Sequence, residues 1–104
     1  MFGLKKKYNS ITSEQVQGLM KDANYIIIDV REAFEFEKGH IPGAKLLPLG
    51  QIPKRINEID KEKSIIVVCA SGGRSSNAAN YLSQQGFDVS NMMGGMMAWA
   101  GPTK

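Results

Sequence analysis

The stretch Ser64-Ile-Ile-Val-Val-Cys69-Ala-Ser-Gly-Gly-Arg74-Ser75 decides the fold of this chain. Its first six residues are mostly apolar and β-branched, without polar alternation, which is typical of a strand buried on both faces. Two glycines then break the strand, and residues 75–85 carry a helical pattern that Gly86 closes as a C-cap. A buried strand, a tight loop and a helix in this order indicate one unit of a parallel sheet.

The same alternation of strands and helices extends in both directions from this stretch. On the N-terminal side, Thr12-Ser-Glu-Gln15 predicts a capping box that opens a helix through Val16, Leu19 and Met20. We then expect a buried strand at Tyr25–Val30, a short helix at Glu32–Glu37, a brief strand at Leu46–Leu49 and a helix from Pro53 that turns Ile56 and Ile59 inward. On the C-terminal side, we expect a strand at Phe87–Val89 and a turn opened by Gly94-Gly95 around Trp99. The pattern predicts an α/β fold, a central parallel sheet covered by helices on both faces.

Length and composition are those of a single globular domain. Of 104 residues, 42% are hydrophobic and 22% charged, which excludes disordered, collagenous and fibrous classes. A chain of this length buries roughly 65% of its unfolded surface, enough for one core without disulfides or metal. Cys69 is the only cysteine and His40 the only histidine, so an internal disulfide and a four-ligand zinc site of nitrogen and sulfur are excluded.

Charge and hydropathy limit the cellular location and the kinds of partner that we expect for this chain. No apolar run approaches the roughly 18 residues of a membrane span, and the first residues place Lys5–Lys7 after the apolar ones, unlike a secretory signal. The net charge of +3 slightly favours anionic ligands. Apart from Lys5–Lys7 the basic residues are scattered and not interleaved with aromatic ones, which argues against nucleic-acid binding. We therefore expect a cytoplasmic monomer with no membrane or nucleic-acid partner, no cofactor and no metal.

Cys69 lies where parallel sheets bind their ligands, at the carboxyl end of a buried strand. Gly72 and Gly73 can take φ values that side chains resist, so the loop N–H groups can converge on an anion. The helix that starts near Ser75 adds the positive end of its dipole, and Arg74 adds a fixed charge. These features stabilise a thiolate, whereas a small buried cysteine needs none of them. We predict Cys69 to be the nucleophile. Its anion-binding loop is Ala70, Ser71, Gly72, Gly73, Arg74 and Ser75.

Other chemistries fit the same residues less well. A nucleotide-binding P-loop needs a Gly-Lys-Ser/Thr sequence, and this segment has no lysine. A protease pair of Cys69 with His40 is not excluded by spacing, but it leaves the glycines and Arg74 without a role. The thioethers of Met92, Met93, Met96 and Met97 are possible copper(I) ligands. Methionine more often fills gaps or lines adaptable surfaces, so we expect some of the four to rim the Cys69 pocket as an apolar docking surface.

The Cys-x4-Arg-Ser loop resembles the active-site loop of rhodanese-like sulfurtransferases. The segments Asp29-Val-Arg31-Glu32, Glu35 and Gly39-His40-Ile-Pro-Gly43-Ala44 are similar to the family's N-terminal signature, and Met93-Gly94-Gly95-Met-Met-Ala-Trp99 is similar to its C-terminal one. The resemblance runs from about Ile11 to Gly101. It implies a single rhodanese-like domain over residues 1–104, with a core at about 11–101 and a basic N-terminal tail at 1–8.

The resemblance also implies a ping-pong sulfur transfer. Cys69 takes a sulfane sulfur from a donor, thiosulfate or a persulfide, and its own persulfide passes that sulfur to cyanide, a thiol or a sulfur-carrier protein. Related phosphatases and arsenate reductases use the longer loop Cys-x5-Arg, so we do not expect phosphatase activity. Many thiosulfate-preferring members have Arg or Lys directly after the cysteine, and Ala70 in that place predicts weak thiosulfate binding. The alternative function is a rhodanese-like module that binds or regulates without turnover.

The signature residues outside the loop have two possible roles. His40 is either a general base for Cys69 or, with Asp29, Arg31 and Glu35, part of a hydrogen-bonded tie between the Gly39–Gly43 turn and the sheet. We expect the tie, because buried polar groups need partners and a thiolate held by N–H donors needs no base. Trp99 is expected to pack in the core, with Gly94 and Gly95 allowing close backbone approach.

Overall fold

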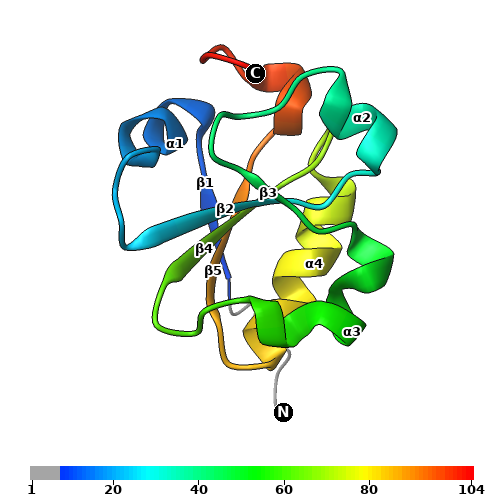
Figure 1. The fold of residues 1–104 in the computed structure, drawn as a ribbon. Helices are drawn as coiled ribbons and strands as arrows, with labels where there is room; N and C mark the ends of the chain where they lie inside the picture. Colours follow the sequence, from blue (N-terminus) through cyan, green and yellow to red (C-terminus); the bar gives the residue numbers. More distant parts are fainter. Residues whose placement is uncertain (1–7) are drawn as a thin grey trace.

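A five-stranded parallel sheet forms the centre of the molecule (Figure 1). The computed structural model describes residues 8–104. The strands are β1 (Asn9–Ile11), β2 (Tyr25–Asp29), β3 (Lys45–Leu46), β4 (Ser64–Val68) and β5 (Asp88–Met92), in the order β1-β5-β4-β2-β3. Central β4 pairs with β2 in a register that ends at Asp29↔Val68. The residues that follow these two strands therefore leave the sheet side by side.

Helices cover both faces of the sheet, as the sequence predicted. The α-helices are α1 (Ser13–Leu19), α2 (Ala33–Glu37), α3 (Ile52–Arg55) and α4 (Gly73–Gln84), and the 3₁₀ turns are η1 (Leu49–Gln51), η2 (Ile56–Glu58) and η3 (Gly95–Ala98). Figure 1 shows α1 on one side of the sheet and α3 and α4 on the other. The α/β class and the parallel sheet are confirmed.

Two apolar clusters fill the space between the sheet and its covering layers. The α4 and α3 side includes Ile28, Val67 and Leu82, and the α1 and η3 side includes Val16, Ile27 and Ile66. Neighbouring residues of β2, Ile27 and Ile28, thus point into different clusters. Fully burying one such side chain contributes about 1.5–3 kcal/mol to folding. The prediction that β2 and β4 are buried on both faces is confirmed, and the two clusters hold the carboxyl ends of these strands in place.

Local sequence signals fix several element ends where they were expected. Thr12 Oγ1 accepts from the backbone N–H of Gln15 at 3.1 Å and the Gln15 side chain accepts from the Thr12 N–H at 2.9 Å, which is the predicted capping box. At the end of α4, Gly86 has φ +93 and the Phe87 N–H donates to the Leu82 carbonyl at 3.1 Å. This is a Schellman C-cap, and it ends α4 as predicted.

Several element boundaries of the prediction were wrong. The helix expected from Pro53 ends at Arg55, so Ile56 lies in η2 and Ile59 follows it in extended backbone. The strand expected at 46–49 is only Lys45–Leu46, because Pro48 has no N–H for a ladder and η1 follows at once. The last strand is longer than 87–89 and runs over Asp88–Met92. The short first strand, β1, was not predicted. Tyr8, assigned to a tail over 1–8, packs partly buried against the α4-side cluster, whereas the remainder of that tail, 1–7, lies outside the described residues.

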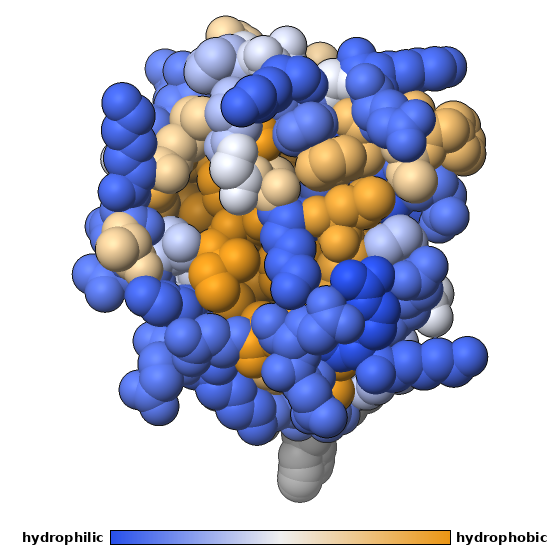
Figure 2. All heavy atoms as spheres, in the orientation of Figure 1, coloured by the Kyte–Doolittle hydropathy of each residue, from blue (hydrophilic) through white to orange (hydrophobic). Residues whose placement is uncertain are grey.

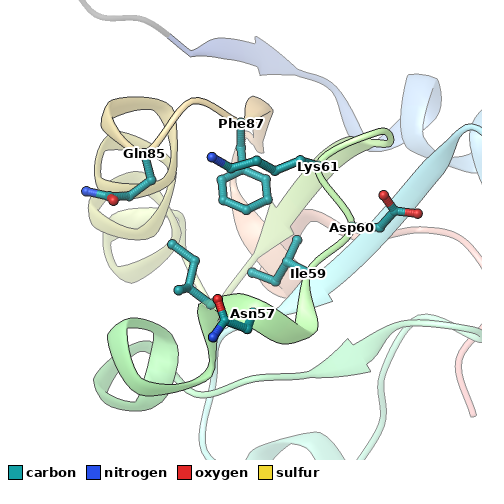
Figure 3. A pocket seen from close by; sticks show the side chains of 7 residues that line it. Asn57, Ile59, Asp60, Lys61, Gln85 and Phe87 are labelled. Carbon is teal, nitrogen blue, oxygen red and sulfur yellow. The ribbon is translucent and has the colours of Figure 1, made fainter.

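One face of the molecule has an apolar centre with polar and charged side chains around it (Figure 2). A groove of about 500 Å³ lies at the end of the sheet where β4 and β5 begin, lined by Ile56, Asn57, Ile59, Asp60, Lys61, Gln85 and Phe87. The Lys61 ammonium lies 5.2 Å from the centre of the Phe87 ring (Figure 3). Within residues 8–104, no helix is both long and apolar enough to cross a bilayer.

Candidate active site

The Cys69 sulfur is held at the floor of a backbone loop. Cys69 directly follows β4 and is 1% exposed. The backbone N–H of Gly72 donates to its Sγ at 3.1 Å, and the buried Ser75 hydroxyl donates to the same atom at 3.3 Å. Both donors come from the first turn of α4 or its cap, so the sulfur lies against the positive end of that helix.

Gly72 makes this loop possible. It is the N-cap of α4 and has φ +108, a left-handed conformation that residues with side chains rarely adopt. That turn directs the Gly72 N–H toward the sulfur. Gly73, for which we expected a similar role, lies in α4 with no positive φ. The expectation was right for the first glycine and wrong for the second.

Hydrogen bonds decide the acidity of the thiol. Burial alone raises the pKa of Cys69, and it is the largest single influence. The Ser75 hydroxyl and the backbone N–H groups of Ser75, Gly72 and Ser71 favour the thiolate, and together they bring the pKa of Cys69 below that of a free thiol. The loop can therefore hold an anionic sulfur at one defined point.

The sequence predicted that Arg74 adds a fixed positive charge near the sulfur, but in the structure this charge is paired with a carboxylate. The Nη1 and Nη2 atoms of Arg74 donate to the two carboxylate oxygens of Glu35 in α2, at 2.7 and 2.8 Å. The hydrogen bonds to Arg74 are the main cause that lowers the pKa of Glu35 to about 2, and Glu35 in turn raises the pKa of Arg74. The guanidinium charge is thus largely balanced by a carboxylate, and the low pKa of Cys69 depends chiefly on the loop N–H groups and Ser75.

The signature residues on the β2 side support the site without bonding to the sulfur. The guanidinium of Arg31 binds the buried Asp29 carboxylate at 2.8 Å and the Gly39 carbonyl at 2.9 Å. His40 Nδ1 lies 2.8 Å from the Phe36 carbonyl, and its ring stacks on the Phe36 ring. These contacts fit the expected structural tie at the Gly39–Gly43 turn. Glu35 is the exception, because its carboxylate reaches Arg74 and the N–H of Glu32 instead of the turn.

The backbone of η3 is hydrogen-bonded to the cysteine loop. The backbone N–H of Met96 donates to the Cys69 carbonyl at 2.8 Å, and that of Met97 donates to the Ala70 carbonyl at 3.0 Å. This close approach needs the glycine at position 95, where a Cβ would lie 2.5 Å from both carbonyl oxygens. Trp99 packs against the α1-side cluster and donates from Nε1 to the Pro102 carbonyl at 2.8 Å. Trp99 is only half-buried, at the edge of this cluster, so the expected core packing holds in part. The expected close backbone approach is found at Gly95 and not at Gly94, where a Cβ would meet the Ala98 side chain. The sequence did not reveal that the approached backbone is the cysteine loop.

The methionine cluster divides between the core and the surface. Met92 is fully buried and Met96 packs against the same cluster, whereas Met93 and Met97 are 47% and 82% exposed. Met97 is tied to the loop by its N–H bond to Ala70. Met97 therefore lies beside the loop, whereas Met93 bonds through its N–H to the Ile11 carbonyl and Met92 and Met96 are structural. That methionines form an apolar docking rim at Cys69 stays a prediction.

Sequence reasoning missed the partners that come from distant elements. Glu35 precedes Arg74 by 39 positions, and no local pattern links them. Asn91 of β5 is buried behind the loop, with its Nδ2 3.5 Å from the Gly72 carbonyl. Asp88 and Ser90 of the same strand are polar too, so no signal in the sequence marks Asn91 as the buried one.

Comparison with known proteins places this geometry in a family. The family model of the rhodanese-like domain matches residues 12–102. The chain is 46% identical over 83 residues to YtwF of Bacillus subtilis, named a putative sulfurtransferase, which covers 80% of this chain and 81% of that protein. It is 44% identical over 89 residues to YrkF of the same organism, named a putative sulfur carrier protein, covering 85% of this chain but 48% of that protein.

The solved structures agree with the sequence relatives. The crystal structure of a rhodanese-related protein from Thermoplasma volcanium superposes with a TM-score of 0.88 at 30% identity. The match covers 93% of this chain and 98% of that one. The Cys69 loop, the parallel sheet and these matches lead to one assignment. The chain belongs to the family of rhodanese-like domains.

Proposed function

We propose that this protein is a sulfurtransferase that carries sulfur as a persulfide on Cys69. The observation that carries the proposal is the convergence of the Gly72 N–H and the Ser75 hydroxyl on Cys69 Sγ. Donors aimed at this sulfur stabilise the negative charge of the Cys69 thiolate. After loading, the charge is on the outer sulfur of the persulfide, and we propose that the same loop stabilises it there. The printed names of the two Bacillus subtilis relatives, sulfurtransferase and sulfur carrier, support the same class of reaction.

The first half-reaction loads the cysteine. The Cys69 thiolate attacks the sulfane sulfur of a donor, a new S–S bond forms, and the bond between that sulfur and the rest of the donor breaks. The leaving group, sulfite from thiosulfate or a thiolate from a persulfide, departs with the bonding electron pair. No base is needed at this step, because the hydrogen bonds to Cys69 already lower the pKa of its thiol.

The second half-reaction removes the outer sulfur from the Cys69 persulfide. A thiophilic acceptor, cyanide in an assay or a thiol of a small molecule or sulfur-carrier protein, attacks the outer sulfur. The S–S bond breaks, and the Cys69 thiolate leaves into the same set of donors that held it at the start. Ala70 places no charge beside the sulfur, so we propose a persulfide as a better donor than thiosulfate.

Mass spectrometry of the intact protein tests the proposal. After incubation with thiosulfate or cysteine persulfide, the protein should gain the mass of one sulfur atom on the peptide that contains Cys69. Cyanide should remove that mass, which distinguishes it from the two oxygens of oxidised methionines. Cys69→Ser should not load and should lose thiocyanate formation, with its circular dichroism unchanged.

The alternative is a binding module without turnover, which the 1% exposure of Cys69 favours. Failure of the reduced protein to load from any of these donors, while iodoacetamide still modifies Cys69, would establish the binding module and reject the sulfurtransferase.

A further inference from the structure

The ion pair between Glu35 and Arg74 determines how much positive charge the mouth of the loop presents. Arg74 is the only cation between Cys69 and Ser75. Both of its terminal nitrogens are bound by one carboxylate, and the two side chains are 38% and 22% exposed. The pair is therefore open to ions from solvent, yet close to neutral as a unit.

Glu35 is fixed in this position by its own helix. Its Oε1 accepts the backbone N–H of Glu32 at 3.0 Å as well as the Arg74 Nη1. The nearest other guanidinium, Arg31, is buried and bound to Asp29. Because the pKa of Glu35 is about 2, its carboxylate stays charged throughout the range in which the thiolate reacts. Glu35 therefore balances the charge of Arg74 over that whole pH range.

We propose that Glu35 is a specificity-determining residue that, by pairing with Arg74, selects against dianionic sulfur donors at Cys69. Thiosulfate brings two negative charges to the loop, and a small-molecule persulfide brings one or none at its reacting group. An unpaired Arg74 would attract the dianion more strongly. With Arg74 neutralised by Glu35, the charge of a donor has little effect on its binding, and the reactivity of its sulfane sulfur decides which donor is used. This inference rests on the proposed function for its biological meaning, but its electrostatic content does not require turnover.

Alkylation of Cys69 by two reagents of different charge tests that content directly. Iodoacetate is an anion and iodoacetamide is neutral, and both react with the same thiolate, so the ratio of their rates reports the potential at the sulfur independently of its pKa. Glu35→Gln keeps the shape of the side chain and an acceptor for the Glu32 N–H, but it removes the charge. We expect the ratio of the iodoacetate to the iodoacetamide rate to rise about threefold to tenfold, as for one partly exposed charge.

The matched control is Glu37→Gln. It removes the same charge from the same helix, at an exposed position two residues away. The rate ratio of this variant should stay within twofold of the wild type. Added salt should shrink the effect of Glu35→Gln, because the pair is exposed to solvent.

A double-mutant cycle of Glu35 and Arg74 tests the same pair with further variants, in case one of them folds poorly. Arg74→Gln leaves Glu35 unpaired and should lower the rate ratio, and the double variant Glu35→Gln/Arg74→Gln should return it close to the wild type. In turnover, Glu35→Gln should lower KM for thiosulfate by a similar factor, with kcat and the KM for cysteine persulfide changed less than twofold.

Three outcomes would overturn the inference: an unchanged rate ratio in Glu35→Gln, an equal change in Glu37→Gln, or equal shifts of KM for both donors. Failure of the proposed function looks different, because a protein that never loads sulfur still yields the alkylation ratio. A raised ratio without any loading would retain the role of Glu35 in anion selection and reject the sulfurtransferase.

Discussion

Gly95 lies directly against the carbonyl group of Cys69, close enough that a Cβ at position 95 would stand 2.5 Å from the Cys69 oxygen. Gly95 also has φ +58, in the left-handed region. Position 95 therefore needs glycine for two reasons, the lack of room for a Cβ and the positive φ. Both features allow the N–H groups of Met96 and Met97 to reach the carbonyls of the cysteine loop.

Gly95→Ala should loosen the active-site loop. The added methyl group pushes the Cys69 and Ala70 carbonyls away from their donors, so we expect the free energy of unfolding in urea to fall by about 1–3 kcal/mol. Gly18→Ala is the control, because Gly18 lies in α1 with nothing within 4 Å of an added Cβ, and it should be as stable as the wild type or slightly more so. A Gly95→Ala protein of wild-type stability would contradict the steric argument.

Ser75→Ala should raise the pKa of Cys69. The Ser75 hydroxyl is the largest of the influences that lower this pKa, and a hydrogen bond to a charged group corresponds to about one pKa unit or more. The midpoint of the pH profile for iodoacetamide alkylation should therefore move to higher pH, with slower reaction below it. Ser76→Ala, one residue along α4 and bonded to Tyr8 instead, should leave the midpoint in place. A midpoint that Ser75→Ala does not move would show that the loop N–H groups suffice.

Ala70→Arg should improve the use of thiosulfate. The loop carries no unbalanced charge, and a guanidinium next to the nucleophile attracts a dianion, so KM for thiosulfate should fall several-fold at low ionic strength and less so in salt. Ala70→Met, which is long but neutral, should lack this gain. Equal KM values for the Arg and Met variants would indicate that position 70 does not face the donor.

Arg31→Met should destabilise the fold strongly. It leaves the Asp29 carboxylate, which is 0% exposed, without its guanidinium partner. Breaking a buried pair in this way costs about 3–5 kcal/mol, measurable by urea unfolding. Arg55→Met removes one side of the exposed pair with Glu58 and should change stability little. Similar losses in both variants would refute the distinction between buried and exposed pairs.

The sequence was sufficient wherever a signal was local. The run before Cys69, the Gly86 cap and the Thr12 capping box each specify their structure within a few residues, and all three were predicted. β1 was missed because its three residues, Asn9–Ile11, are exposed or only half-buried, so no apolar pattern marks them. The end of β5 was missed because Ser90 and Asn91 are polar although the strand continues through them.

The environment of Arg74 was beyond local reasoning for a different reason. A guanidinium beside a thiol suggests a free positive charge, and only the packing of α2 against the loop reveals the carboxylate that binds it. In the same way, the glycines at 94 and 95 indicated close backbone contact but not its partner. Contacts between distant segments depend on the complete topology, and here they determine the electrostatics of the site.

The hydrogen bonds between η3 and the cysteine loop also make the surroundings of the thiol depend on a segment far along the chain. Met96 and Met97 are synthesised well after Cys69, and β5 must join the sheet before they can reach the two carbonyls. A chain that lacked η3 would lose these two bonds, although Gly72 and Ser75, which donate to the sulfur, would still be present. The segment after β5 therefore acts on the thiol through the position of the loop and not through a bond to the sulfur, so a change far along the chain can alter the reactivity of Cys69.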